Sequence, residues 1–243
     1  MRGFIMAALL MLALPLCAEE KAAEQSAADK YNSGDYLGAV ELYQREAQAD
    51  PANPYVLYNL ANSYFKSGDG DKALVYYFRA FKILPRDADI RHNLAFALQS
   101  TGQKLVPDGI PDMVFNLYHY YSLPELKGLC ALFAWLSAIL LMIYLFGGKN
   151  GKVKGAVLIC GGIFVLLGIW LLARYPSDTQ RVAVVTVPRA ELRSGPGDNF
   201  PVSVTVPRAH LLLIEDGKGE WDKVSIKDTN SSGWVLNKSI EEI

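Results

Sequence analysis

The chain has 243 residues, of which 51% are hydrophobic, and its 24 Lys and Arg residues nearly balance its 25 Asp and Glu residues. This balance argues against a nucleic-acid partner, because such proteins carry a basic face that neutralises phosphates. Three cysteines are too few for a disulfide framework. A mean hydropathy of +0.13 beside an ordinary 20% of charged residues indicates that the apolar residues are concentrated in particular segments.

The first apolar block, Phe4 to Leu16, follows a basic second residue and has 13 residues without a charge. As a helix it would extend only about 20 Å, short of the roughly 30 Å hydrocarbon core of a bilayer. Together with Cys17-Ala18 before two glutamates, it predicts a secretory signal peptide over residues 1–18. An uncleaved anchor, an amphipathic N-terminal helix and lipidation of Cys17 are the alternatives.

Two further blocks, Gly128 to Phe146 and Gly155 to Ala173, each contain 19 residues without a charge. Both are long enough to cross a bilayer, and they predict transmembrane helices over residues 128–146 and 155–173. The alternative is a pair of helices buried in a soluble core, but the rest of the chain offers no core of that size. The connecting residues 147–154 include three lysines, which predict that this loop stays in the cytoplasm. Both regions that flank the two spans then lie on the opposite side of the membrane.

Between residues 19 and 104 the chain repeats itself with a period of 34 residues. The matched positions are Gly34 with Gly68, Ala39 with Ala73, Tyr43 with Tyr77, Pro51 with Pro85, and Asn59-Leu60-Ala61 with Asn93-Leu94-Ala95. Such a period, with small residues at fixed places and a closing proline, is typical of tetratricopeptide repeats. It predicts an all-α solenoid of about 2.5 repeats, near the minimum for a stable array, whose third unit supplies only a first helix.

The region is therefore similar to tetratricopeptide scaffolds that bind peptides and proteins on a concave face lined by the first helix of each unit. The resemblance implies a protein-binding groove formed by Tyr31, Asn32, Tyr58, Asn62, Phe65, Lys66, His92, Phe96 and Gln99. An aromatic and amide groove suits an extended segment or a helix. The alternative is that the tyrosines only fill space between helices. Glu24 and Asp89 lie among the positions where family members clamp a C-terminal carboxylate, so we do not predict tail capture.

Residues 105–127 form a membrane-proximal segment before the first predicted span. Ile110, Met113, Val114, Leu117 and Tyr121 follow helical spacing, which predicts a short helix lying along the membrane surface. An irregular linker is the alternative.

After Arg181, short alternating apolar runs separated by turn residues predict five or six strands. The motifs Leu192 to Gly197, Gly219 to Val224 and Gly233 to Val235 are similar to bacterial SH3-like domains, which implies a small all-β barrel over residues 181–243. In that family such barrels bind cell-wall peptides or glycans, or serve as docking modules. Phe200, Trp221 and Trp234 could form an aromatic surface there. Alternatively, the two tryptophans close the barrel core.

No pattern in the chain predicts catalysis, a cofactor or a metal site. His92, His119 and His210 lie in three separate segments without metal-ligand spacing. Phosphate loops, nucleophile elbows and zinc-protease motifs are missing from the sequence. We therefore expect recognition modules rather than an enzyme.

The order of these segments, with Asn59 to Tyr64, Tyr77 to Ala80 and Asp89 to Ala95, resembles the BatE family of the bacterial aerotolerance (Bat) operon over essentially the whole chain. The resemblance implies a non-enzymatic inner-membrane scaffold with both terminal domains in the periplasm. It also implies that the protein functions in oxygen or stress tolerance, together with membrane proteins that carry von Willebrand A domains and with a MoxR-type ATPase. Tyr118 to Ser122 stands where a tryptophan-rich stretch is expected. A peptidoglycan-binding envelope sensor, or an accessory to a cell-wall enzyme, is the alternative.

Overall fold

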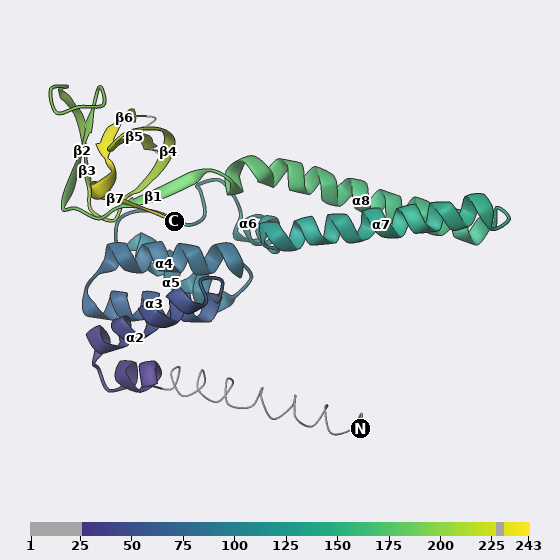
Figure 1. The fold of residues 1–243 in the computed structure, drawn as a ribbon, viewed down its shortest axis with the longest axis horizontal. Helices are drawn as coiled ribbons and strands as arrows, with labels where there is room; N and C mark the ends of the chain where they lie inside the picture. The colour runs from purple at the N-terminus through teal and green to yellow at the C-terminus, as the bar shows by residue number, and fades with distance from the viewer. Residues whose placement is uncertain (1–25, 227–230) are drawn as a thin grey trace, which may run out of the picture.

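The computed structural model describes residues 26–226 and 231–243, so the predicted signal peptide over residues 1–18 lies outside the described residues. The chain forms a stack of helices, a long helical hairpin and an antiparallel sheet domain (Figure 1). Residues 26–32 are helical and precede the other elements. These are α2 (Tyr36–Ala49), α3 (Pro54–Ser67), α4 (Gly70–Ile83), α5 (Ala88–Gln99), α6 (Asp112–Tyr118), α7 (Leu123–Phe146), α8 (Gly151–Asp178), β1 (Arg181–Val185), β2 (Arg189–Arg193), β3 (Val202–Pro207), β4 (Leu211–Lys218), β5 (Trp221–Ile226), β6 (Ser231–Leu236), a 3-10 turn (Asn237–Ser239) and β7 (Ile240–Glu242).

Capping residues begin and end the helices of the stack at the predicted repeat spacing. The side chain of Asn53 accepts hydrogen bonds from the backbone N–H groups of Tyr55 and Val56 and starts α3, with proline in its first turn. Gly68 ends α3 in the left-handed region at φ 94°, where glycine carries no Cβ penalty. Asp87 caps α5 as Asn53 caps α3, and the two caps are one repeat length apart.

Small residues and buried leucines form the core of this helical stack, defined as residues 26–99. Ala61 and Ala73 are fully buried, which lets α3 and α4 approach closely, and Leu74 and Leu94 fill the space between neighbouring helices. Val184 and Ala209 of the sheet domain belong to the same apolar cluster, so the stack and the sheet domain share one continuous core.

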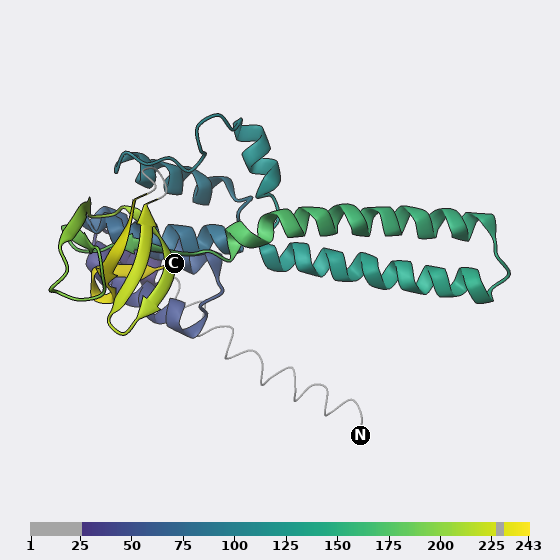
Figure 2. The same cartoon turned by 90° about the horizontal axis from the view of Figure 1, so that it is seen from above.

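The helices α7 and α8 lie side by side and project away from the other elements as a hairpin (Figures 1 and 2). Each is long and apolar enough to cross a membrane. In the most apolar 18-residue stretch of each helix, only 6% of α7 and 0% of α8 is buried. This exposure does not fit the predicted alternative of helices buried in a soluble core.

Both helices run beyond the predicted spans, because Ser122 caps α7 together with Glu125 and Asn150 caps α8. The loop is therefore only residues 147–150.

The membrane-proximal segment contains the helix α6, which contacts the base of the hairpin. Its Phe115 side chain is buried, whereas the Tyr118 hydroxyl donates a 3.0 Å hydrogen bond to the carbonyl of Ala173. The indole N–H of Trp170 donates to the carbonyl of Tyr118 at 3.3 Å. The predicted helix is thus present, although it covers only residues 112–118.

Charged side chains join the stack, α7 and α8 at the base of the hairpin. Arg174 is 3% exposed, donates to the carbonyl of Tyr121 and lies 2.5 Å from the Asp178 carboxylate. Arg86 of the loop after α4 contacts both carboxylate oxygens of Glu125 at 2.8 Å. Because these contacts join the loop after α4 to α7, and the segment after α6 to α8, they fix the direction in which the hairpin leaves the stack.

The C-terminal strands form one seven-stranded antiparallel sheet in the order β3-β2-β6-β5-β4-β1-β7. The strands β3 and β7 end this order and do not pair with each other in the described residues, so the sheet is open and the predicted closed SH3-like barrel is not confirmed. Its core is formed by Val185, Ala190, Leu192, Val206, Leu212, Val224 and Val235. The sheet also has one or two more strands than the alternating pattern predicts.

The sheet domain docks on the α4 side of the stack (Figures 1 and 2). Arg208 lies 2.7 Å from the Asp71 carboxylate, which is 2% exposed. The amide of Gln103 donates to the carbonyl of Ala209 at 2.9 Å and accepts from the N–H of Leu211 at 3.0 Å. Together with the shared apolar cluster, these polar contacts join the sheet domain to the stack and to the segment that follows it.

Candidate functional site: a groove on the helical stack

The inner face of the helical stack carries a cavity of about 360 Å³. The helix over residues 26–32, α3 and α5 supply most of its walls, and α4 supplies one tyrosine. The lining residues are Tyr31, Tyr58, Asn62, Phe65, Lys66, Tyr77, His92, Asn93 and Phe96.

A hydrogen-bond network fixes the floor of this cavity. The Tyr77 hydroxyl donates to the side-chain oxygen of Asn62 at 2.6 Å. The Asn93 amide donates to the same oxygen at 3.1 Å and to the Tyr58 hydroxyl at 2.8 Å. The rings of Tyr58 and Tyr77 also contact each other, with centroids 6.0 Å apart. Four polar side chains are thus ordered before any ligand arrives. This order lowers the loss of side-chain conformational entropy on binding.

Burial keeps the phenols of the groove uncharged. It raises the pKa of Tyr58 and of Tyr31 above the usual value near 10, and it raises the pKa of the more deeply buried Tyr77 further. In the neighbouring core, burial raises the pKa of Tyr64 to about 12. At neutral pH these hydroxyls therefore act as hydrogen-bonding groups rather than as charges.

The mouth of the groove combines an aromatic pair with two exposed polar side chains. The rings of Phe65 and Phe96 meet edge to face with centroids 5.8 Å apart, and Phe96 is 55% exposed. Lys66 and His92 are exposed beside them. The mouth can accept an apolar side chain, while the polar floor can hydrogen-bond a main-chain amide.

A second cavity of about 250 Å³ lies beside the first and is lined in part by the helix over residues 26–32. Tyr31 and Asn62 line both cavities, so the two are parts of one groove. The residues around the second cavity are Ala28, Tyr31, Asn32, Tyr43, Asn59 and Asn62.

The structure places eight of the nine predicted groove residues along this groove. Seven line the first cavity, Asn32 lines the second, and Gln99 at the end of α5 lines neither. Sequence reasoning missed Tyr77 and Asn93, which complete the floor. The 34-residue period could have indicated Asn93, because it repeats Asn59, and both line the groove.

The aromatic residues of the sheet domain lie outside its core. Trp234 pairs with Lys223 and with Arg193 across neighbouring strands, and paired residues point to the same face of a sheet. Val224 and Val235, the next residues along those strands, point to the opposite face and are buried. Trp234 and Trp221 therefore occupy the outer face, where they are partly exposed, rather than closing the core.

Phe200 is in the loop between β2 and β3, and its ring lies against Gly195, where a Cβ would come within 2.6 Å of it. The Arg193 guanidinium donates to the carbonyl of Phe200 at 2.8 Å and holds this loop. In the part of the chain that the structure describes, no group of three or more His, Cys, Asp or Glu side chains could hold a metal ion.

Comparison with known proteins matches the helical stack. The tetratricopeptide repeat family matches residues 54–87. Photosystem I assembly protein Ycf3 from Prochlorococcus marinus (strain MIT 9211) is 29% identical over 106 residues, which cover 41% of this chain and 61% of that protein. The chain thus spans about three fifths of the length of this curated relative.

Similar solved structures share only part of the arrangement. A MamA mutant has 24% identity and a TM-score of 0.33, covering 35% of this chain and 49% of that chain. PcrH in complex with the chaperone binding region of PopD has 11% identity and a TM-score of 0.33, and the match covers 61% of this chain and 90% of that chain. The Yersinia enterocolitica type III secretion chaperone SycD with a YopD peptide has 13% identity and a TM-score of 0.33, covering 61% and 92%. The helical stack of this chain contains a tetratricopeptide repeat at residues 54–87.

Proposed function

We propose that the chain is a non-enzymatic membrane adaptor whose helical stack binds an extended segment of a partner protein. The observation that carries this proposal is the groove itself, with an ordered polar floor at Asn62 and an apolar mouth at Phe65 and Phe96. Ordered amides and phenols can hydrogen-bond the main chain of a segment, and the apolar mouth can hold one of its side chains. The hairpin of α7 and α8 anchors the stack in the membrane.

The partner complex is the second part of the proposal. We place the adaptor in the bacterial inner membrane, in a Bat-type complex of oxygen or stress tolerance with von Willebrand A domain proteins and a MoxR-type ATPase. Its support is the order of the segments in the chain and the resemblance that this order carries. A cross-linked partner that has neither type of domain would contradict this assignment.

Replacing Phe96 with alanine is expected to weaken partner binding without unfolding the stack. The ring is 55% exposed, so its loss changes the free energy of unfolding by about 0.5 kcal/mol or less. An aromatic at a binding hot spot contributes about 2 kcal/mol, which corresponds to roughly 30-fold weaker binding. The measurement is the yield of adduct from a photo-cross-linking amino acid placed at His92 in living cells.

Tyr55→Ala is the matched control, because Tyr55 is also 55% exposed but lies on α3 outside the groove. We expect its adduct yield to equal that of the unmodified chain. Equal yields from the Phe96→Ala and Tyr55→Ala variants, or no adduct from His92 at all, would remove the groove as the binding site.

The outer face of the sheet supports a second candidate function, the binding of peptidoglycan. Trp221 and Trp234 present partly exposed rings there beside Arg193 and Lys223, and such rings can stack on sugars. The detergent-solubilised full-length chain is then expected to sediment with purified sacculi, and Trp234→Ala to reduce the bound fraction severalfold. If the unmodified chain stays in the supernatant, the sheet domain does not recognise the wall.

A further inference from the structure

The helix α6 presents an apolar face that no other described element covers. Met113 is 79% exposed, Val114 54% and Leu117 64%. Ile110 before the helix and Tyr120 after it extend the same exposed set, at 43% and 47%. The spacing of residues 110, 113, 114 and 117 places these side chains on one face of a helix.

The opposite face of α6 ties it to the helical stack. Phe115 is buried, and its ring lies 4.2 Å from that of His119, which is 6.0 Å from the ring of Phe81 on α4. The apolar face of α6 thus points outward because the other face is already occupied. Any surface that it meets will fix the orientation of the stack.

Contacts with α8 set the depth of α6 relative to the hairpin. Tyr118 at the end of α6 bonds to the backbone of Ala173 and to the indole of Trp170. Ala173 is the last residue of the uncharged run of α8, and the charged Arg174 follows it. The helix α6 therefore lies at the level where the apolar surface of the hairpin gives way to charged side chains.

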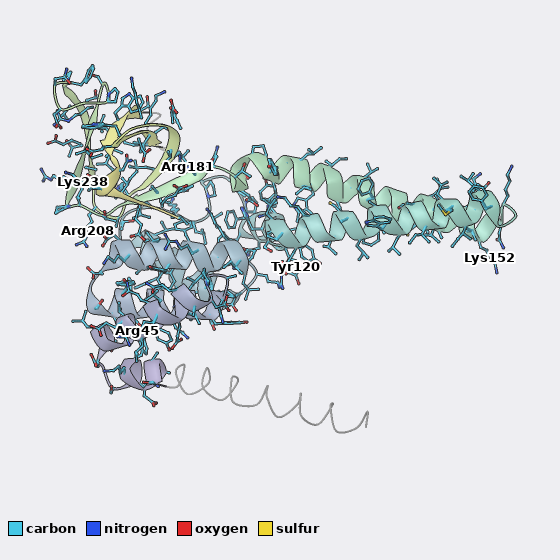
Figure 3. The ribbon with its side chains drawn as sticks, viewed as in Figure 1. Arg45, Tyr120, Lys152, Arg181, Arg208 and Lys238 are labelled. Atoms are coloured by element: carbon cyan, nitrogen blue, oxygen red, sulfur yellow. The ribbon has the colours of Figure 1, made fainter. Side chains whose placement is uncertain are left out.

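Lipid is the occupant that this position favours. Tyr118 at the end of α6 bonds to Trp170 and Ala173 of the hairpin, whose apolar side chains are largely exposed, and Figure 3 shows Tyr120 at the hairpin's base. Tyr118, Tyr120, Tyr121, Trp170 and Tyr175 gather at this level, as aromatic residues do at membrane interfaces. We propose that the exposed face of α6 inserts into the lipid headgroup boundary and sets the orientation of the helical stack against the membrane. This inference rests on the proposed membrane insertion of α7 and α8.

The test uses the full-length chain in phosphatidylcholine vesicles, with its three cysteines replaced by alanine. A fluorescent label sensitive to polarity is attached in separate variants at Met113→Cys on α6, Met142→Cys on α7 and Leu37→Cys on α2. Met142 and Leu37 are 64% and 68% exposed and report hairpin insertion and water exposure respectively. The quencher is a phosphatidylcholine with a nitroxide near the top of its acyl chain, and Leu117→Cys repeats the measurement at a second α6 site.

We expect the nitroxide lipid to lower the emission from residue 113 by about twofold, as it does at residue 142, because interfacial helices lie about 5–10 Å deep. Emission from residue 37 is expected to stay constant. Iodide added to the buffer serves as a second quencher, which reaches only labels that are exposed to water. If the nitroxide lipid quenches residue 142 but iodide quenches residues 113 and 117 as it quenches residue 37, the inference fails while the anchoring of the hairpin stands. Shielding of residue 113 from both quenchers indicates a protein cover and overturns the inference. If residue 142 is not quenched, the proposed anchoring fails as well.

Discussion

Alkaline phosphatase inserted in the loop over residues 147–150 is expected to be inactive, whereas the same enzyme fused after Ile243 is expected to be active. The enzyme works only after export from the cytoplasm. The two fusions therefore report which side of the membrane holds the loop and which side holds the sheet domain. The reverse pattern would contradict the proposed orientation, and with it every proposed periplasmic partner.

The physical reason is the distribution of positive charge at the two ends of the hairpin. Lys149, Lys152 and Lys154 are exposed and have no ion pair in the part of the chain that the structure describes. At the other end Arg86 and Arg174 are neutralised by Glu125 and Asp178. Moving one charge against the membrane potential costs about 2.3 kcal/mol per 100 mV. At a potential of about 100 mV the three lysines together therefore oppose export by about 7 kcal/mol.

Replacing the three lysines with glutamine is expected to give a mixed population in which both fusions show activity. Replacing them with arginine keeps the charge and is expected to leave the original pattern unchanged. If the glutamine variant behaves like the arginine variant, the lysines do not contribute to the orientation of the chain.

Local patterns predicted the helices and the groove better than they predicted the sheet. The 34-residue period predicts the repeated helices, and the resemblance to tetratricopeptide scaffolds implies one shared inner face for Tyr58, Asn62 and Phe96, which line the same cavity. Gln99 lies outside the groove, since α5 ends there. Tyr77 comes from a second helix, and only the observed network with Asn62 and Asn93 reveals its place in the floor.

The sheet and its docking depend on contacts that no local pattern contains. Alternation predicts strands, whereas closure into a barrel depends on the stagger and tilt of all strands together. The short strand β7 pairs with β1, about sixty residues earlier in the chain. Gln103 likewise contacts Leu211, which is 108 residues away. The outward position of Trp234 follows from the same strand register rather than from its hydrophobicity.

Arg174→Ala is expected to cause the largest loss of stability among single substitutions at the base of the hairpin. The sequence places Arg174 directly after a predicted span, as an ordinary flanking charge, but the structure buries it to 3% exposure against Asp178. Removing it leaves the Asp178 carboxylate and the Tyr121 carbonyl without this partner. Loss of one member of a buried pair costs about 3–5 kcal/mol, which lowers Tm by roughly 10 °C in a chain of this size.

Thermal unfolding of the full-length chain in detergent, followed by tryptophan fluorescence, measures this effect. Arg45→Ala is the control, because Arg45 is exposed on α2 and its loss is expected to shift Tm by about 2 °C or less (Figure 3). The double variant Arg174→Met with Asp178→Leu removes both charges and is expected to recover part of the loss, since no unpaired carboxylate remains. A Tm for Arg174→Ala equal to that of Arg45→Ala would show that the Arg174 side chain does not hold α8 to the segment after α6. Loss of stability in the double variant as large as in Arg174→Ala would assign the effect to packing rather than to the unpaired charge.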